Sequence, residues 1–277
     1  MEIPSTVVEL IKHAIEEDIG PGDITTSLLV PEGNESRALY IAKGNFMLAG
    51  MPFAREVFRI IDPSTSFNVY YHEGAKVSRG DVLGEVSGKT RALLAGERVS
   101  LNILQRLSGV ASLTSQFVDA VQGTGAKIVD TRKTTPCQRF MEKYAVRIGG
   151  GMNHRFGLFD GILIKDNHIE EVGGIREAVG LAKGGHHLAR IEVEVENLKD
   201  LQEAIDAGAD VVMLDNMSVP DMTEAVKLVD GRVTVEASGN VSLGNVREIA
   251  ETGVDLISVG ALTHSVIAAD ISMKIVK

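Results

Sequence analysis

Cysteine is nearly absent from this chain, because Cys137 is the single one among 277 residues. One cysteine excludes an internal disulfide and any metal site built from several thiolates. It also agrees with a reducing compartment, where structural disulfides are rare. Catalysis through Cys137 stays open as the less favoured alternative.

Long hydrophobic runs are missing as well. No window reaches the roughly 18 uninterrupted apolar residues of a membrane-spanning helix, and residues 1–23 are acidic and polar, unlike a signal peptide. We therefore expect a protein of the cytoplasm with no membrane partner. Hydrophobic residues make up 44% of the chain and charged residues 24%, the composition of an ordinary folded protein.

Basic residues are in deficit, with 28 Lys and Arg against 38 Asp and Glu and a net charge of −10. This balance disfavours nucleic acid as a partner, because phosphate contacts dominate that affinity. The stretch from Lys127 to Lys165 carries a positive net charge instead, since it holds eight Lys and Arg against three acidic residues. A cationic zone inside an acidic protein indicates a site for a small anion.

The length of the chain favours two domains over a single barrel. A helical pattern near Ser5–Glu17 precedes strand-like runs over 38–50 and 66–88, which glycines interrupt as turns would. From Thr90 to about Val121 the apolar residues take helical spacing, which predicts one long helix at the junction.

Beyond Gly125 the chain alternates between short β-branched runs and helical patterns. Nearly continuous apolar runs predict strands buried on both faces, hence a parallel sheet covered by helices. Six such units favour an incomplete (β/α) barrel, and a doubly wound open sheet is the alternative. The runs lie at 127–130, 161–165, 190–195, 210–215, 232–237 and 255–260.

Charged or small residues stand at the carboxyl end of every run. One such residue after a strand is usually a solvated turn residue or a helix cap. Five consecutive units with charged ends favour a shared polar cavity instead, because strand ends form the mouth of a βα barrel. The residues are Asp130 to Lys133, Lys165 and Asp166, Glu194 and Glu196, Asp215 and Asn216, Glu236 and Ser238, and Gly260.

The kinds of residue at these ends indicate what the cavity binds. The turns at 238–240 and 260–264 each precede a helical pattern and predict a phosphate seat. Glu194 and Asp215 are candidates for Mg²⁺, directly or through water, or for ribose hydroxyls; otherwise they neutralise nearby cations. The Arg and Lys residues that follow the first two runs suit a ligand with carboxylates. His154, beside Arg155, is either a functional residue or an ordinary loop histidine.

These residues lie in motifs that resemble those of the quinolinate phosphoribosyltransferase family. The match runs in order through nearly the whole chain. It comprises EDIGPGDITT (17–26), GERVSLNILQRLSGVAS (96–112), TRKTTPCQR (131–139), EKYAVRIGGGMNHR (142–155), ILIKDNHI (162–169), VEVE (193–196), MLDN (213–216), EASGN (236–240) and SVGALTHS (258–265). Cys137 stands where the family usually has glycine, and Ile148 where a cysteine is common.

The resemblance implies an N-terminal α/β sandwich-like domain (1–110), the barrel (111–265) and a C-terminal segment (266–277) that returns to the first domain. It implies a homodimer or hexamer in which each N-terminal domain covers its partner's site. The implied quinolinate ligands are Arg132, His154, Arg155 and Lys165, with Arg98 from the other subunit. The implied contacts to phosphoribosyl pyrophosphate and Mg²⁺ are Lys133, Glu194, Asp215, Ser238, Gly239, Gly260 and His264, of which Lys133, Glu194 and Asp215 would be catalytic.

The activity implied by the resemblance is the joining of quinolinate to phosphoribosyl pyrophosphate with loss of carbon dioxide, which yields nicotinate mononucleotide for NAD biosynthesis. Two rivals stay open. One is a nicotinate phosphoribosyltransferase, against which the surplus of cations argues. The other is a binding or accessory protein related to molybdenum transport, against which the retained metal and phosphate residues argue.

Overall fold

The computed structural model describes residues 2–185 and 188–276. Residue 1, where the predicted N-terminal domain begins, and residue 277, where the predicted C-terminal segment ends, lie outside the described residues. The chain divides into two compact units. The first comprises residues 1–113, 135–149 and 266–277, and the second comprises 114–134 and 150–265. The predicted barrel range 111–265 thus includes a segment, 135–149, that packs with the first unit.

The first unit is built on a four-stranded antiparallel sheet in the order β12-β1-β5-β3. Its strands are β1 (Glu35–Ala42), β3 (Ser66–Val69), β5 (Val82–Lys89) and β12 (Ile271–Val276), and β2 (Phe46–Met47) pairs with β4 (Lys76–Val77). Its helices are α1 (Ser5–Ile19), α2 (Ile24–Leu29), α3 (Met51–Ile61), α5 (Arg139–Ile148) and α4 (Thr90–Ala120) as far as residue 113.

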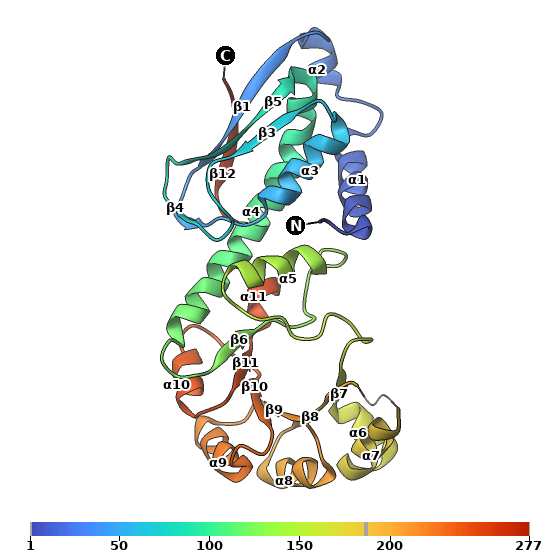
Figure 1. Cartoon of the computed structure of the whole chain (residues 1–277), viewed down its shortest axis with the longest axis vertical. Coiled ribbons are helices and arrows are strands. Elements are labelled where there is room, and N and C mark those ends of the chain that lie inside the picture. Colours follow the sequence, from blue (N-terminus) through green and yellow to red (C-terminus); the bar gives the residue numbers. More distant parts are fainter. Residues whose placement is uncertain (1, 186–187, 277) are drawn as a thin grey trace. The chain divides into compact units, whose positions relative to one another are not determined.

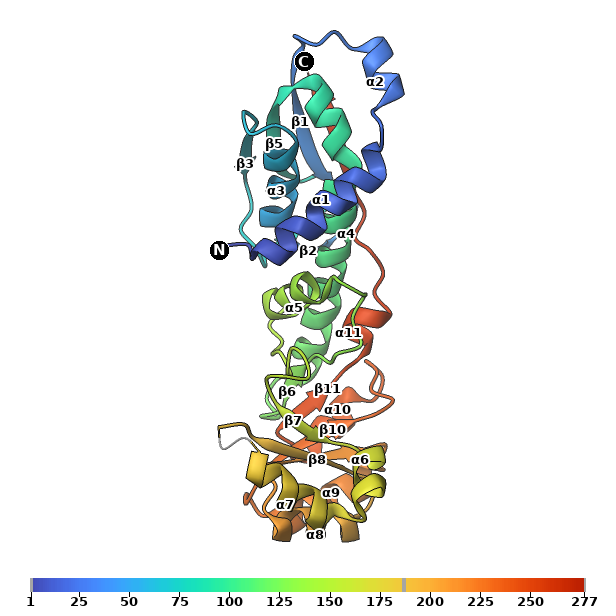
Figure 2. The same ribbon diagram turned by 90° about the vertical axis from the view of Figure 1, so that its right-hand side faces the viewer.

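Helices α3 and α4 share the core of this unit with the sheet. Tyr40 of β1, Leu83 of β5, Phe58 of α3 and Leu104 of α4 are fully buried in one cluster. Helix α1 packs against α3, and the two lie side by side in both views (Figures 1 and 2). The predicted helices near Ser5–Glu17 and over 90–121 are confirmed within two residues at each end.

Segment 135–149 joins the first unit through contacts that are distant in sequence. The Tyr144 hydroxyl donates to Glu73 at 2.8 Å, and its ring meets Phe53 edge-on at 5.3 Å between centroids. Cys137 in this segment is exposed and has a φ of 64°, a left-handed backbone that favours glycine. The glycine that is usual in the resembling family therefore suits this turn better than cysteine does.

The second unit is an incomplete (β/α) barrel with a parallel sheet in the order β6-β11-β10-β9-β8-β7. All six predicted runs are strands. They are β6 (Lys127–Val129), β7 (Ile162–Ile164), β8 (Ile191–Val195), β9 (Val211–Asp215), β10 (Thr234–Ser238) and β11 (Leu256–Ser258). Strands β6 and β7 are the two edges and do not pair over the part of the chain that the structure describes, so the barrel stays open.

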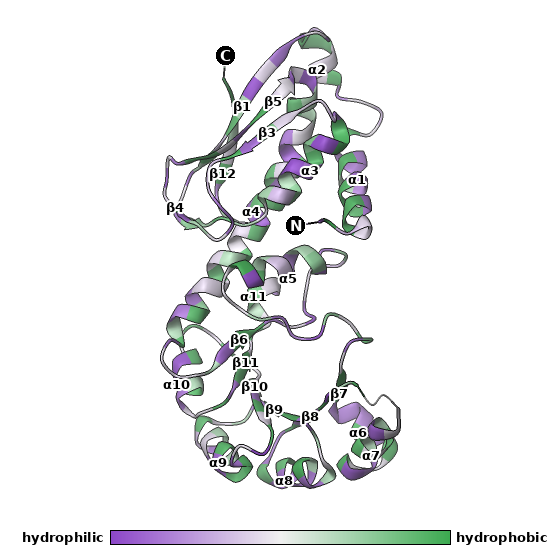
Figure 3. Cartoon of the chain, viewed as in Figure 1, coloured by the Kyte–Doolittle hydropathy of each residue, from purple (hydrophilic) through white to green (hydrophobic). Residues whose placement is uncertain are grey.

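Helices follow strands β7 to β11, and most of them lie around the outside of the sheet, although the last and shortest lies elsewhere (Figure 1). They are α6 (Asp166–Val172), α7 (Ile175–Gly185), α8 (Leu198–Ala207), α9 (Val219–Val229), α10 (Val246–Glu251) and α11 (Ala261–His264). Helices α7, α8 and α9 each carry hydrophobic and hydrophilic residues (Figure 3), and their buried residues pack on the strands. Side-chain caps at Asn197 and Ser218 start α8 and α9 directly after their strands.

No helix over residues 2–185 and 188–276 is both long and apolar enough to cross a bilayer.

Candidate active site

A cavity of about 630 Å³ lies in the second unit and is lined by residues at the carboxyl ends of the strands. It brings together most of the predicted site residues. They are Arg132, Lys133, His154, Arg155, Lys165, Glu194, Asp215, Ser238 and Gly239. Gly260 lies beside this group, because a Cβ added to it would meet the Lys133 side chain and the His264 ring at 3.1 Å. Arg98 is an exposed residue of α4 in the first unit.

Four cations from the early strand ends line the cavity: Arg132, Lys133, Arg155 and Lys165. Burial and the neighbouring charge of Arg132 hold the pKa of the Arg155 guanidinium below its usual value. The Nη1 atom of Arg155 donates to the Gly161 carbonyl at 3.2 Å, while its buried Nε has no hydrogen-bond partner in the described ranges. Lys165 forms an ion pair with Glu194. Such a cationic lining suits a ligand with more than one carboxylate.

Two aspartates fix the backbone that carries Arg155. Asp130, fully buried after β6, accepts hydrogen bonds from the His154 N–H at 2.8 Å and from the Asn153 amide at 2.6 Å. Asp160 accepts the N–H groups of Phe156 and Gly157 at 2.6 and 2.8 Å, which closes the following loop. Asp130 therefore fixes the backbone next to Arg155. The sequence indicated only that a charged residue stands at this strand end.

The turn after β10 has a left-handed, close-fitting backbone that requires glycine. Gly239 has a φ of 95°, and a Cβ added there would lie 2.2 Å from Asn216 Oδ1. Asn240 donates to the same Asn216 oxygen at 2.9 Å, which ties this turn to the end of β9. Helix α10 was expected directly after this turn, but it begins at Val246 because residues 240–245 form a turn of their own, closed by hydrogen bonds to Asn245.

Gly239→Ala is expected to weaken the binding of inorganic pyrophosphate by about 10-fold to 100-fold, because left-handed strain and the clash with Asn216 cost roughly 1–3 kcal/mol. Calorimetric titration with pyrophosphate measures this. Gly231→Ala is the matched control, since its φ is 70° and nothing lies within 4 Å of the added Cβ. Equal affinities in the two variants would remove the turn from the anion site.

Glu194 and Asp215 lie at the carboxyl ends of the neighbouring strands β8 and β9 and line the same cavity. Asp215 accepts from the Asn216 amide at 2.8 Å, and Glu194 accepts from Lys165. Mg²⁺ usually takes one or two carboxylates together with phosphate oxygens and water. The donor chemistry of this pair fits that ion.

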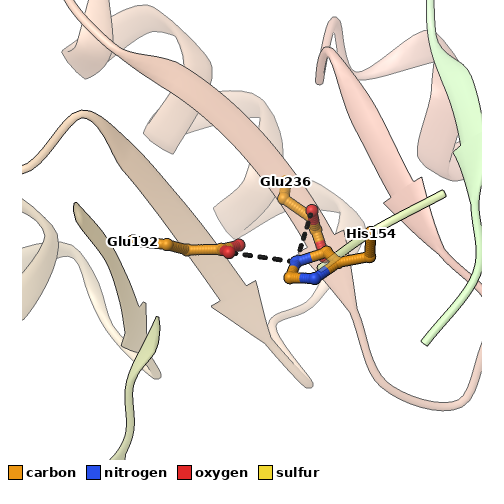
Figure 4. A group of neighbouring side chains, drawn as sticks. All are labelled: His154, Glu192 and Glu236. Carbon is orange, nitrogen blue, oxygen red and sulfur yellow. Dashed lines mark ion pairs between the residues drawn. The ribbon is translucent and has the colours of Figure 1, made fainter. Parts of the chain in front are cut away.

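A second cluster of ionisable groups lies deeper in the second unit: His154, Glu192 and Glu236 (Figure 4). His154 Nε2 lies 3.0 Å from Glu192 Oε2 and 3.6 Å from Glu236 Oε2. Burial, together with the negative charge of Glu192, raises the pKa of Glu236 to about 7. Sequence reasoning missed Glu192, although a glutamate between Ile191 and Val193 inside an apolar strand is itself a signal of an inward-facing polar group.

Glu236→Gln is expected to gain stability relative to the native chain as the pH rises from 5 to 8. The folded chain holds the Glu236 proton up to about pH 7, whereas the unfolded chain loses it near the ordinary value of 4.5. The native chain therefore loses stability across this interval, by about 3 kcal/mol in total, and glutamine does not titrate. Thermal unfolding of both proteins at pH 5 and 8 measures the difference. A difference in Tm between the two proteins that is the same at pH 5 and pH 8 would contradict this prediction.

Family models match this chain along nearly its whole length. The N-terminal domain of quinolinate phosphoribosyl transferase matches residues 23–108, and the C-terminal domain of the same family matches residues 110–274. This chain belongs to the quinolinate phosphoribosyltransferase family.

Individual relatives agree with the family. A probable nicotinate-nucleotide pyrophosphorylase (carboxylating) from Bacillus subtilis is 44% identical over 268 residues, which cover 96% of this chain and 92% of that protein. The mitochondrial quinolinate phosphoribosyltransferase (decarboxylating) 2b from Nicotiana tabacum is 42% identical to this chain. The alignment covers 96% of this chain and 81% of the tobacco protein. The solved nicotinate-nucleotide pyrophosphorylase of Francisella tularensis has a TM-score of 0.95 at 42% identity, over 99% of this chain and 98% of that one.

Proposed function

We infer that this chain transfers the phosphoribosyl group of phosphoribosyl pyrophosphate to quinolinate and releases carbon dioxide, which gives nicotinate mononucleotide and pyrophosphate for NAD biosynthesis. The observation that carries this function is one cavity lined by four cations, by the strand-end carboxylates Glu194 and Asp215, and by a glycine turn. Arg132, Arg155 and Lys165 suit a dicarboxylate, and the remaining residues suit a phosphorylated sugar.

We assign Arg132, His154, Arg155 and Lys165 to the carboxylates of quinolinate. A guanidinium binds a carboxylate through two parallel hydrogen bonds, and this fixes the plane of the acid. Arg155 is held near the cavity by the hydrogen bond from its Nη1 to the Gly161 carbonyl. Glu194 holds Lys165 through their ion pair within the lining of the cavity.

We assign the other side of the cavity to phosphoribosyl pyrophosphate. Ser238, Gly239 and Gly260 offer backbone N–H groups to phosphate, and His264 and Lys133 lie beside Gly260. Glu194 and Asp215 would hold Mg²⁺. That ion, when bound, supplies positive charge to the pyrophosphate oxygens.

The reaction needs little proton transfer from the protein. The pyridine nitrogen forms a bond to the ribose carbon as the bond to pyrophosphate breaks, and Lys133 stabilises the charge of the departing group. Glu194 and Asp215 face the positive charge that develops on the sugar. The bond between the ring and its 2-carboxylate then breaks, and the electron pair is stabilised by the quaternary nitrogen until a proton replaces carbon dioxide. Positioning and electrostatics supply most of the rate.

Arg98 is assigned to the site of a second copy in a homodimer or hexamer, because its side chain is exposed on α4. Mixing an Arg98→Ala protein with a Lys133→Ala protein is then expected to restore about a quarter of native activity, since half of the randomly formed dimers have one intact site. Turnover after subunit exchange measures this recovery. Each variant alone is the control, and absence of recovery despite proven exchange would place Arg98 outside a shared site.

We also propose that the protein acts in the cytoplasm. Its one cysteine, Cys137, is exposed, as suits a reducing compartment.

Equilibrium binding separates quinolinate from nicotinate as the acid substrate. Calorimetric titrations would compare quinolinate, nicotinate and phthalate, which has two adjacent carboxylates but no ring nitrogen. We expect quinolinate and phthalate to bind at least tenfold more tightly than nicotinate, because a second carboxylate adds charge-assisted hydrogen bonds. Tighter binding of nicotinate would favour the nicotinate transferase.

A further inference from the structure

Asn216 makes three hydrogen bonds between the ends of β9 and β10. Its backbone N–H donates to the Ser238 carbonyl at 2.9 Å. Its side-chain amide donates to Asp215 Oδ2 at 2.8 Å, and its amide oxygen accepts from the Asn240 amide at 2.9 Å. All four residues line the cavity of the second unit. One side chain thus joins the carboxylate at the end of β9 to the glycine turn after β10.

The chemistry of the partners fixes the direction of each bond. An ionised carboxylate only accepts hydrogen bonds, so the Asn216 amide must turn its NH2 group toward Asp215. Its oxygen then faces Asn240, whose side chain donates through its own NH2 group. The Asn240 carbonyl in turn accepts from the Asn245 amide at 3.0 Å. The side-chain amides therefore form a directed series that ends on the Asp215 carboxylate.

The backbone is left-handed at both asparagines of this series. Asn216 has a φ of 54° and Asn240 a φ of 49°. Residues with a side chain rarely adopt this conformation, although asparagine visits it because its amide can hydrogen-bond locally. Glycine would adopt both turns at no steric cost. The asparagines therefore contribute what glycine lacks, which is the amide group.

The Asn216 amide also packs directly on the glycine turn. A Cβ added to Gly239 would lie 2.6 Å from Asn216 Cγ and 3.0 Å from its backbone nitrogen. The Asn216 side chain thus fills the space that a side chain at position 239 would need. The place of the turn relative to the end of β9 therefore depends on the orientation of this one amide.

We propose that Asn216 is a positioning residue that holds the Asp215 carboxylate and the turn at 238–240 at one fixed spacing, so that both engage the phosphorylated substrate together. This inference rests on the proposed function, since it concerns the seat of phosphoribosyl pyrophosphate. Mg²⁺ usually takes carboxylate and phosphate oxygens at the same time, which requires that the two groups be in register. A seat that is ordered before the ligand arrives loses less conformational freedom on binding.

The first test removes the amide and keeps the backbone. Asn216→Gly is expected to raise the dissociation constant for inorganic pyrophosphate, titrated by calorimetry with Mg²⁺, about tenfold, the scale of one or two lost hydrogen bonds. The dissociation constant for quinolinate should change less than about twofold, because its cations belong to the segments around β6 and β7. Asp230→Gly is the matched control, since Asp230 is also left-handed, with a φ of 47°, but caps α9 outside the cavity lining. Equal losses for pyrophosphate and quinolinate in Asn216→Gly would indicate a merely structural role and overturn the proposal, as would an unchanged affinity for pyrophosphate.

The second test asks whether the amides act as one series. Asn240→Gly is expected to weaken pyrophosphate binding about fivefold in the native background, the scale of a single hydrogen bond. In an Asn216→Gly background the same change should have less than about a twofold effect, because its partner is gone. Equal factors in both backgrounds would overturn the proposal, and so would a native protein that binds no pyrophosphate with Mg²⁺. Turnover of quinolinate decides the proposed function separately, so a chain that turns quinolinate over but is unaffected by Asn216→Gly loses only this assignment.

Discussion

Arg155→Ala is expected to raise the dissociation constant for quinolinate by about 100-fold or more and to change that for phosphoribosyl pyrophosphate less than threefold. Truncating one partner of a desolvated, hydrogen-bonded charge pair costs roughly 2–5 kcal/mol. The side chain is partly buried, its Nε has no hydrogen-bond partner among the residues that the structure describes, and it lines the cavity beside other cations. Calorimetric titration with each substrate separates the two effects.

Arg176→Ala is the control for this variant. It removes the same charge from an exposed position on α7 of the same unit, outside the residues that line the cavity. Affinity for quinolinate should then stay within a factor of two, because single exposed charges contribute little. Equal losses of both substrates in Arg155→Ala would remove Arg155 from the seat of the acid.

Lys133→Ala is expected to lower kcat by about 100-fold to 1,000-fold, the scale of losing one preorganised group that stabilises transition-state charge. Its main chain is held at both ends: the Lys133 N–H donates to Thr131 Oγ1 at 3.0 Å, and its carbonyl accepts from Thr263 Oγ1 at 2.7 Å. The side chain is exposed and lies beside Gly260, so its loss should leave the fold intact.

Single-turnover kinetics of Lys133→Ala distinguish the step that is affected. We expect slow release of pyrophosphate and an unchanged dissociation constant for quinolinate. Lys133→Arg keeps the charge with a different shape and should recover part of the rate. A variant that releases pyrophosphate at the native rate and is slow only in releasing carbon dioxide would move Lys133 away from the leaving group.

Local patterns predicted the barrel strands and the long helix well. Each strand of the second unit is a self-contained β-branched run, and the apolar spacing after Thr90 continues unbroken to the end of α4. Charges at consecutive strand ends also predicted which side chains share a cavity, because parallel strands bring those ends to one edge.

Contacts between residues that are far apart in the sequence could not be predicted from local patterns. Segment 135–149 joins the first unit through Tyr144 and Glu73, which no local spacing reveals. The Glu192–Glu236 pair depends on the register of β8, β9 and β10, and the orientation of His154 depends on Asp130 and the N–H of Arg155.

Turnover with phosphoribosyl pyrophosphate and Mg²⁺, with quinolinate and nicotinate offered in parallel, tests the central claim most directly. Mononucleotide and carbon dioxide would both be followed over time. We predict one carbon dioxide per nicotinate mononucleotide from quinolinate and no product from nicotinate. Turnover of nicotinate alone, or of neither acid, would contradict the account.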